Sequence, residues 1–253
     1  MKVAAYYSLH YGVDYLAYSI KSIYDVVDEI FILYSSTPTF GTSTELTCPD
    51  KTSGLVQEAF LNDVDHKVRW FDGTWKNESD HRTQAHNLAK EMNYDILVMV
   101  DGDEIWDTEV LKEFIKDSYD NPVYELRIKM RHLWRSFNWI CEDVNIQGRI
   151  FNLRESPKNP LTIRIAKAIN NDYLWHFGMA RTLRDIEYKC AIHGHISEWR
   201  SNDWFEKIFK AWKPGMNDVH PTCVDWWSPK AYNKDKMPIF MREHPYFNLK
   251  LII

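Results

Sequence analysis

Short apolar runs alternate with amphipathic stretches along the first part of the chain. The apolar runs occupy residues 2–7, 29–34 and 95–100, and residues 67–71 are a further expected strand. Between them, residues 14–27, 55–61 and 80–92 repeat apolar positions with a helical period. The runs predict buried strands, and the stretches between them predict helices. Strands and helices that alternate in this way favour an α/β fold with a mostly parallel central sheet and right-handed crossovers.

The pattern is less regular after residue 100. The elements expected there are a helix at 108–118, one long alternating strand at 123–133, a strand at 147–153, and helices at 182–192 and 202–212. Prolines become frequent beyond residue 155. Because we find neither an internal repeat nor a clean linker, residues 1–253 predict a single domain with a loop-rich C-terminal lobe.

Composition excludes several classes of protein. Hydrophobic residues make up 45% of the chain and charged residues 26%, which is typical of a globular protein. The net charge of −5 provides no overall attraction to nucleic acid or to an anionic membrane surface. No apolar run is long enough to span a membrane and the four cysteines form no C-x-x-C pair, so we expect a cytoplasmic protein. The 11 tryptophans indicate either a core of large side chains or stacking platforms for sugar rings or bases.

The most informative motif follows the apolar run at 96–100. Asp101, Asp103 and Glu104 place three carboxylates within four positions, and Gly102 lets the backbone bend between them. Carboxylates at the end of a buried strand repel one another unless a cation or a proton offsets their charge. Oxygen ligands suit hard divalent ions such as Mg²⁺ or Mn²⁺. The alternative is an acidic turn in which one Asp caps the next helix.

Three features in register resemble the family 2-type glycosyltransferases, which have the GT-A fold. They are the strand at 27–33, the segment 73–78 followed by 82–89, and the strand at 95–100 with its D-x-D motif. The resemblance covers roughly residues 1–120. It implies a GT-A (Rossmann-like) fold in which residues 1–120 form the nucleotide-sugar-binding half and residues 121–253 the acceptor-side half.

The resemblance also implies a site. Asp101 and Asp103 would hold Mn²⁺ or Mg²⁺ against the diphosphate of a nucleotide-sugar donor, and His176, within Trp-His-Phe-Gly, would complete the metal site. The alternative for His176 is a packed, hydrogen-bonded core residue. The residues expected to bind the donor are Tyr6, Ser8, Arg82, Asn87, Asp101 and Gly102.

The sequence departs from the family at two places. Tyr-Ser-Ser at 34–36 stands where many relatives have an Asp that binds the nucleobase or the ribose. Residues 8–12 replace the usual Asn-Glu after the first strand. Both departures leave the identity of the nucleotide open.

An inverting transfer needs a carboxylate base that deprotonates the acceptor hydroxyl. Asp143, with its neighbour Glu142, is the first choice, and Glu198 and Asp203 are alternatives. Each of these residues could instead be an ordinary surface acid.

The sequence therefore predicts a metal-dependent glycosyltransferase whose acceptor is a glycan, a small molecule or a hydroxymethylated base in viral DNA. The net charge does not favour DNA. Two alternatives remain: a metal-dependent phosphohydrolase or nucleotidyltransferase, and a non-catalytic sugar-binding module.

Overall fold

The computed structural model describes residues 1–38, 47–142, 146–155, 163–167, 172–192, 201 and 203–252. The strands of its larger sheet are β1 (Val3–Leu9), β2 (Glu29–Tyr34), β3 (Val68–Asp72), β4 (Ile96–Val100), β6 (Glu125–Ile128), β9 (Gln147–Asn152) and β10 (Ile163–Ile165). They lie in the order β10-β6-β9-β4-β1-β2-β3, and β9 alone runs antiparallel to its neighbours. This mostly parallel α/β sheet is the fold class that the sequence predicts.

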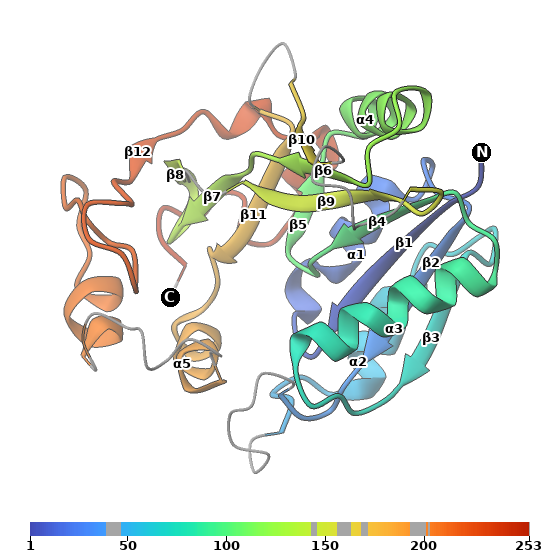
Figure 1. The fold of residues 1–253 in the computed structure, drawn as a ribbon. Coiled ribbons are helices and arrows are strands. Elements are labelled where there is room, and N and C mark those ends of the chain that lie inside the picture. Colours follow the sequence, from blue (N-terminus) through green and yellow to red (C-terminus); the bar gives the residue numbers. More distant parts are fainter. Residues whose placement is uncertain are drawn as a thin grey trace.

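Five α-helices belong to the described part of the chain. They are α1 (Val13–Ile23), α2 (Thr52–Phe60), α3 (Glu78–Glu91), α4 (Thr108–Asp120) and α5 (Leu183–Ile192). Figure 1 shows α3 in front of the large sheet, whereas the chain after residue 200, in orange and red, lies on the far side of the molecule from β3.

The continuous apolar runs explain why helices cover both faces of the large sheet. Along β1, Ala4 and Tyr6 pack against α3, while Ala5 and Tyr7 face the core that α1, α2 and α4 complete. Successive side chains of a strand point to opposite faces, so a strand that is buried on both faces must be apolar at every position.

A histidine fixes the start of α3. Asn77 caps the helix by accepting a hydrogen bond from the backbone N–H of Asp80. His81 is buried, stacks on Trp75 with 3.8 Å between ring centroids, and has Nε2 2.9 Å from the carbonyl oxygen of Leu33. The first turn of α3 is thereby tied to β2, close to the carboxyl edge of the sheet.

A second sheet brings distant segments to the acidic motif. Its strands are β5 (Glu104–Trp106), β7 (Arg131–Trp134), β8 (Ser136–Glu142), β11 (Leu174–Met179) and β12 (Lys230–Ala231), in the order β12-β8-β7-β11-β5. β5 and β11 pair in antiparallel fashion with Glu104 opposite His176, and the N–H of Phe177 donates to the carbonyl oxygen of Asp103 at 2.8 Å. This pairing places His176 beside the acidic motif.

The structure corrects two expectations about secondary structure. Residues 123–133 are not one strand: β6 belongs to the large sheet and β7 to the second, because the chain leaves the first sheet at Lys129 and Met130. The helix expected at 202–212 is a π-helix that spans Phe205–Lys210. The strands β5 and β11 were not predicted from the sequence.

The tryptophans of the C-terminal part belong to a core. Trp134, Trp204, Trp212 and Trp227 are each at most 5% exposed and pack in one cluster. For these four residues the core interpretation is correct. The division at residue 120 stays a prediction, although β6, β9 and β10 from beyond it complete the large sheet.

Candidate functional site

A cavity of about 290 Å³ opens at the carboxyl ends of β1 and β4. It is lined by Ser8, Leu9, His10, Tyr11, Glu78, Arg82, Asp101, Gly102, Asp103, His176, Arg181, Lys189 and Ile192. Ligands of open α/β sheets bind at this edge. Gly102 permits the motif to approach β1, since a Cβ at this position would lie 3.2 Å from Cδ1 of Leu9.

A buried arginine lies beneath the acidic motif. Arg149, on β9, is 1% exposed, and its Nη2 is 2.5 Å from Oε1 of Glu104 and 2.9 Å from Oδ2 of Asp101. The Glu104 carboxylate is fully buried and also accepts a hydrogen bond from the N–H of Asp101. Burial lowers the pKa of Arg149, but the two carboxylates outweigh it and raise that pKa above its usual value. Arg149 therefore remains charged and pairs with both Asp101 and Glu104, while burial raises the pKa of Glu104 to about 7.

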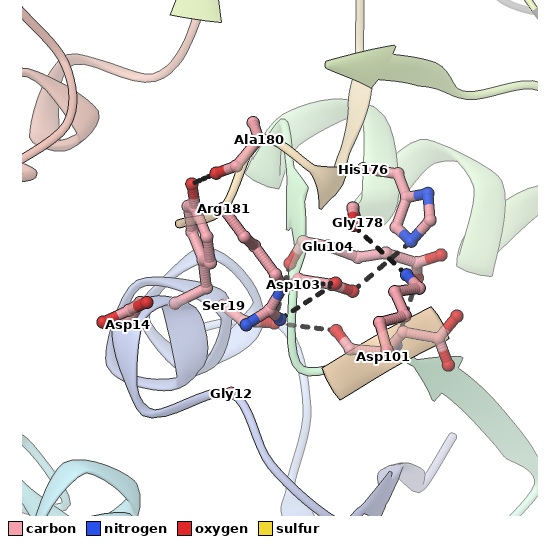
Figure 2. Close-up of polar contacts among 12 residues, drawn as sticks. Gly12, Asp14, Ser19, Asp101, Asp103, Glu104, His176, Gly178, Ala180 and Arg181 are labelled. Atoms are coloured by element: carbon pink, nitrogen blue, oxygen red, sulfur yellow. Dashed lines mark hydrogen bonds and ion pairs between the residues drawn. The ribbon is translucent and has the colours of Figure 1, made fainter. Parts of the chain in front are cut away.

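Asp103 has cationic partners of its own (Figure 2). Arg181, which follows β11, donates from Nη2 and Nε to Oδ2 of Asp103 at 3.0 and 3.3 Å. Nε2 of His176 lies 3.4 Å from the other carboxylate oxygen, Oδ1. Burial raises the pKa of Asp103, but His176 and Arg181 outweigh it and hold that pKa well below its usual value. Asp103 is therefore a carboxylate with one oxygen occupied by Arg181 and one that faces His176.

Aromatic rings and a glycine hold Arg181 in place. Its guanidinium carbon lies 5.1 Å from the ring centroid of Tyr11 and 5.3 Å from that of Tyr15. Gly12 has φ +128°, and a Cβ there would lie 3.2 Å from Nη2 of Arg181. Only glycine adopts this backbone conformation readily, and it also leaves room for the guanidinium.

His132, on β7, orients His176. The two Nδ1 atoms are 2.9 Å apart, so one ring donates to the other. In the tautomer that donates from Nδ1–H of His176, Nε2 carries no proton and can ligate an ion. A partner on the second ring nitrogen is what metal-binding histidines require. No local pattern in the sequence pointed to His132.

The Asp103–His176 pair fits a divalent ion. Two atoms that each lie about 2.1 Å from an octahedral ion are roughly 3 Å apart when they are neighbours, and Oδ1 and Nε2 are 3.4 Å apart. Mg²⁺ and similar ions are often held by one or two protein carboxylates together with substrate phosphates. Among the residues that the structure describes, no group of three or more acids, histidines or cysteines is arranged to hold an ion. The three-ligand set of Asp101, Asp103 and His176 therefore stays a prediction.

The residues expected to bind the donor do not all meet in one place. Ser8, Arg82, Asp101 and Gly102 line the cavity at the acidic motif. Tyr6 lies in an adjoining open cavity of about 540 Å³, which is further lined by Glu78, Ser79, Arg82, Thr83, His86, Lys90, Met99, Tyr124, Glu125, Gly148 and Phe151. Asn87 is exposed and lines a separate hollow on the outer side of α3. Its role as a donor ligand stays a prediction.

The structure describes only two of the four candidate bases. Asp143 and Glu198 fall outside the described residues. Glu142 ends β8 and forms an ion pair with Arg131 at 3.0 Å, and its side chain is 59% exposed. Asp203 is exposed and pairs with Lys207. Of the two acids that the structure describes, neither Glu142 nor Asp203 lines either cavity.

Comparisons with known proteins find similarity to solved structures alone: no family model and no curated protein matches the chain. S. aureus TarS matches at 14% identity with a TM-score of 0.42, over 70% of this chain and 36% of TarS. A second match is glucosyl-3-phosphoglycerate synthase from Mycobacterium tuberculosis, in complex with Mn²⁺, uridine diphosphate and phosphoglyceric acid. It is 12% identical with a TM-score of 0.34, and the match covers 53% of this chain and 43% of the synthase.

A third structure, 4-diphosphocytidyl-2C-methyl-D-erythritol synthase, matches at 13% identity and a TM-score of 0.39, over 60% of this chain and 75% of that one. This chain thus spans less than half the length of the first two proteins. At such values of similarity, function has to be inferred from the site itself.

Removing the cation beneath the motif should destabilise the protein. Arg149→Met leaves Glu104 buried without its partner, so the free energy of unfolding should fall by about 3–5 kcal/mol. The control is Arg242→Met, because Arg242 and its partner Asp235 are both more than half exposed; there the expected change is at most about 1 kcal/mol. Urea denaturation measures both. Equal losses in the two variants would contradict the role assigned to Arg149.

Proposed function

We propose that the chain is a glycosyltransferase that moves a sugar from a nucleoside-diphosphate donor to an acceptor hydroxyl. The observation that carries this proposal is the Asp103–His176 pair, which faces a cavity at the carboxyl ends of parallel strands. In the reaction the bond between the anomeric carbon and the acceptor oxygen forms, and the bond to the diphosphate oxygen breaks. The diphosphate leaves with the electron pair, and the acceptor proton passes to a base.

Asp103 and His176 would hold a divalent cation, with Asp101 on the neighbouring side of the motif. When bound, Mn²⁺ or Mg²⁺ supplies positive charge that offsets the charge of the diphosphate. The protein's own contribution is to present these groups in a fixed geometry: Arg181 holds Asp103 and His132 orients His176. Because the groups are in place beforehand, little reorganisation is needed when the donor binds.

Two buried hydroxyl groups are further evidence that the two cavities bind a polar ligand. Ser8 Oγ and Tyr6 Oη are buried, and neither has a hydrogen-bond partner among the described residues. A buried polar atom without a partner is costly, so a ligand that hydrogen-bonds to it gains affinity. The cavities share Glu78 and Arg82. We place the nucleoside diphosphate in the cavity of Ser8 and the sugar with the approaching acceptor in that of Tyr6.

The alternative is a two-ion phosphohydrolase or nucleotidyltransferase, which would need ligands for a second metal about 3.5–4 Å from the first. The acceptor is not identified, and no helix among the described residues is long and apolar enough to cross a membrane.

Metal-linked binding of uridine diphosphate tests the donor site. Asp103→Asn and His176→Ala should each weaken Mn²⁺-dependent binding by more than about 100-fold, because each alters a direct ligand of the ion and even an outer-shell partner contributes about 10- to 100-fold. Isothermal titration with and without Mn²⁺ separates the metal-dependent part. Asp203→Asn, at an exposed acid far along the chain, is the control and should bind as the unaltered protein does. Variants of Asp103 and His176 that keep full Mn²⁺-dependent affinity would refute the donor site.

We propose Asp143 as the base, since it follows β8 directly and a carboxylate is what the acceptor hydroxyl requires. Asp143→Asn should lower the rate of sugar transfer by about 10²–10⁴-fold, while the affinity for the donor stays unchanged. The rate is measured on an acceptor found by screening for intact-mass changes. Glu109→Gln is the control, because Glu109 is an exposed acid on α4 that pairs with Lys112. A normal rate for Asp143→Asn, or a product that retains the donor's anomeric configuration, would rule this base out.

A further inference from the structure

The helix α5 contributes a lysine to the cavity at the acidic motif. Lys189 lines this cavity together with Arg181, which lies just before the helix. The ammonium Nζ donates one hydrogen bond, to the carbonyl oxygen of Gly178 at 3.2 Å. An ammonium has three protons to donate, and within the described residues no other hydrogen bond of this group is found. Lys189 therefore keeps donor capacity toward the cavity.

Gly178 makes room for this arrangement. A Cβ at Gly178 would lie 2.8 Å from Nζ of Lys189 and 2.6 Å from Cε1 of His176. Figure 2 shows Gly178 between His176 and the acidic motif. The absent side chain lets the ammonium and the imidazole lie on the same patch of the cavity wall. A cation from Lys189 is thus positioned next to the proposed metal ligands.

The neighbouring carboxylates are occupied by other cations. Asp103 is bound by Arg181 and faces His176, and Asp101 is bound by Arg149. No described carboxylate lies within 4.0 Å of the Lys189 ammonium. Burial lowers the pKa of Lys189, and the charge of Asp103 opposes that effect. The ammonium is thus partly desolvated without a direct counter-ion, which makes an incoming anion a favourable partner.

We propose that Lys189 binds the diphosphate directly and gives the site a metal-independent component of nucleotide affinity. This inference rests on the proposed donor site. Arg181 serves a different purpose: its Nε and Nη2 are committed to Asp103, so it positions the carboxylate. Lys189 acts on the ligand itself, as a compact charge that meets a phosphate oxygen. The diphosphate is then bound by two positive charges, the divalent ion and the Lys189 ammonium, which lie on adjacent parts of one cavity wall.

The test compares binding of uridine diphosphate and of inorganic pyrophosphate in chelator and in Mn²⁺ by isothermal titration. In chelator the unaltered protein should bind both. Lys189→Met should weaken that binding by about 10- to 100-fold, the effect of losing one charged hydrogen bond, while Lys189→Arg should retain most of it. Lys112→Met, on the exposed surface of α4, is the control. Thermal unfolding of each variant checks that the fold is intact.

A second measurement needs no variant. Chemical acetylation of the unaltered protein, followed by mass spectrometry, should show that pyrophosphate in chelator protects Lys189 but not Lys112. Equal affinity of Lys189→Met and the unaltered protein in chelator, or no protection of Lys189, would overturn the inference. Binding of uridine diphosphate in Mn²⁺ alone, with none in chelator, would also overturn it but leave the proposed function standing. No binding under either condition would overturn both.

Discussion

Charge compensation around the acidic motif is the constraint on which the site depends. Asp101, Asp103 and Glu104 follow a buried strand, where their mutual repulsion and desolvation would oppose folding. Two arginines form ion pairs with these acids: Arg149, on β9, and Arg181, which follows β11. The Glu104 carboxylate is fully buried, whereas Asp101 and Asp103 line the cavity.

The same compensation joins the two sheets. Arg149 reaches the motif from the large sheet and Arg181 from the loop that follows a strand of the second sheet. β5 begins at Glu104, so the motif itself is the point where the chain passes from one sheet to the other. The geometry of the site therefore depends on correct packing of both sheets, and it cannot be assembled from residues 1–120 alone.

Much of the fold could be predicted from the sequence, because its cause is local. The apolar runs of β1, β2 and β4 mark strands buried on both faces, and the helical repeats that follow these strands mark helices that cover them. The acidic motif was visible for the same reason: its residues are adjacent. β5 was too short to detect, and the break between β6 and β7 depends on which sheet each segment joins.

The partners of the motif could not be predicted in this way. Arg149, Arg181, Lys189 and His132 lie far from Asp101 in sequence, and nothing in their own neighbourhoods marks them. Their roles come from strand pairing, which places Glu104 opposite His176 and His176 opposite His132. A histidine could be proposed at 176 only through a resemblance, while its orienting partner required the structure.

The central claim is that the oxygen of Asp103 and the nitrogen of His176 form the protein's side of a divalent-ion site that also takes a diphosphate. Electron spin-echo spectroscopy of the protein with Mn²⁺ and uridine diphosphate tests this claim most directly, because it detects nuclei coupled to the ion. We predict coupling to phosphorus of the nucleotide together with coupling to one histidine nitrogen. Phosphorus coupling without any histidine nitrogen, or Mn²⁺ that stays free of the protein, would contradict it.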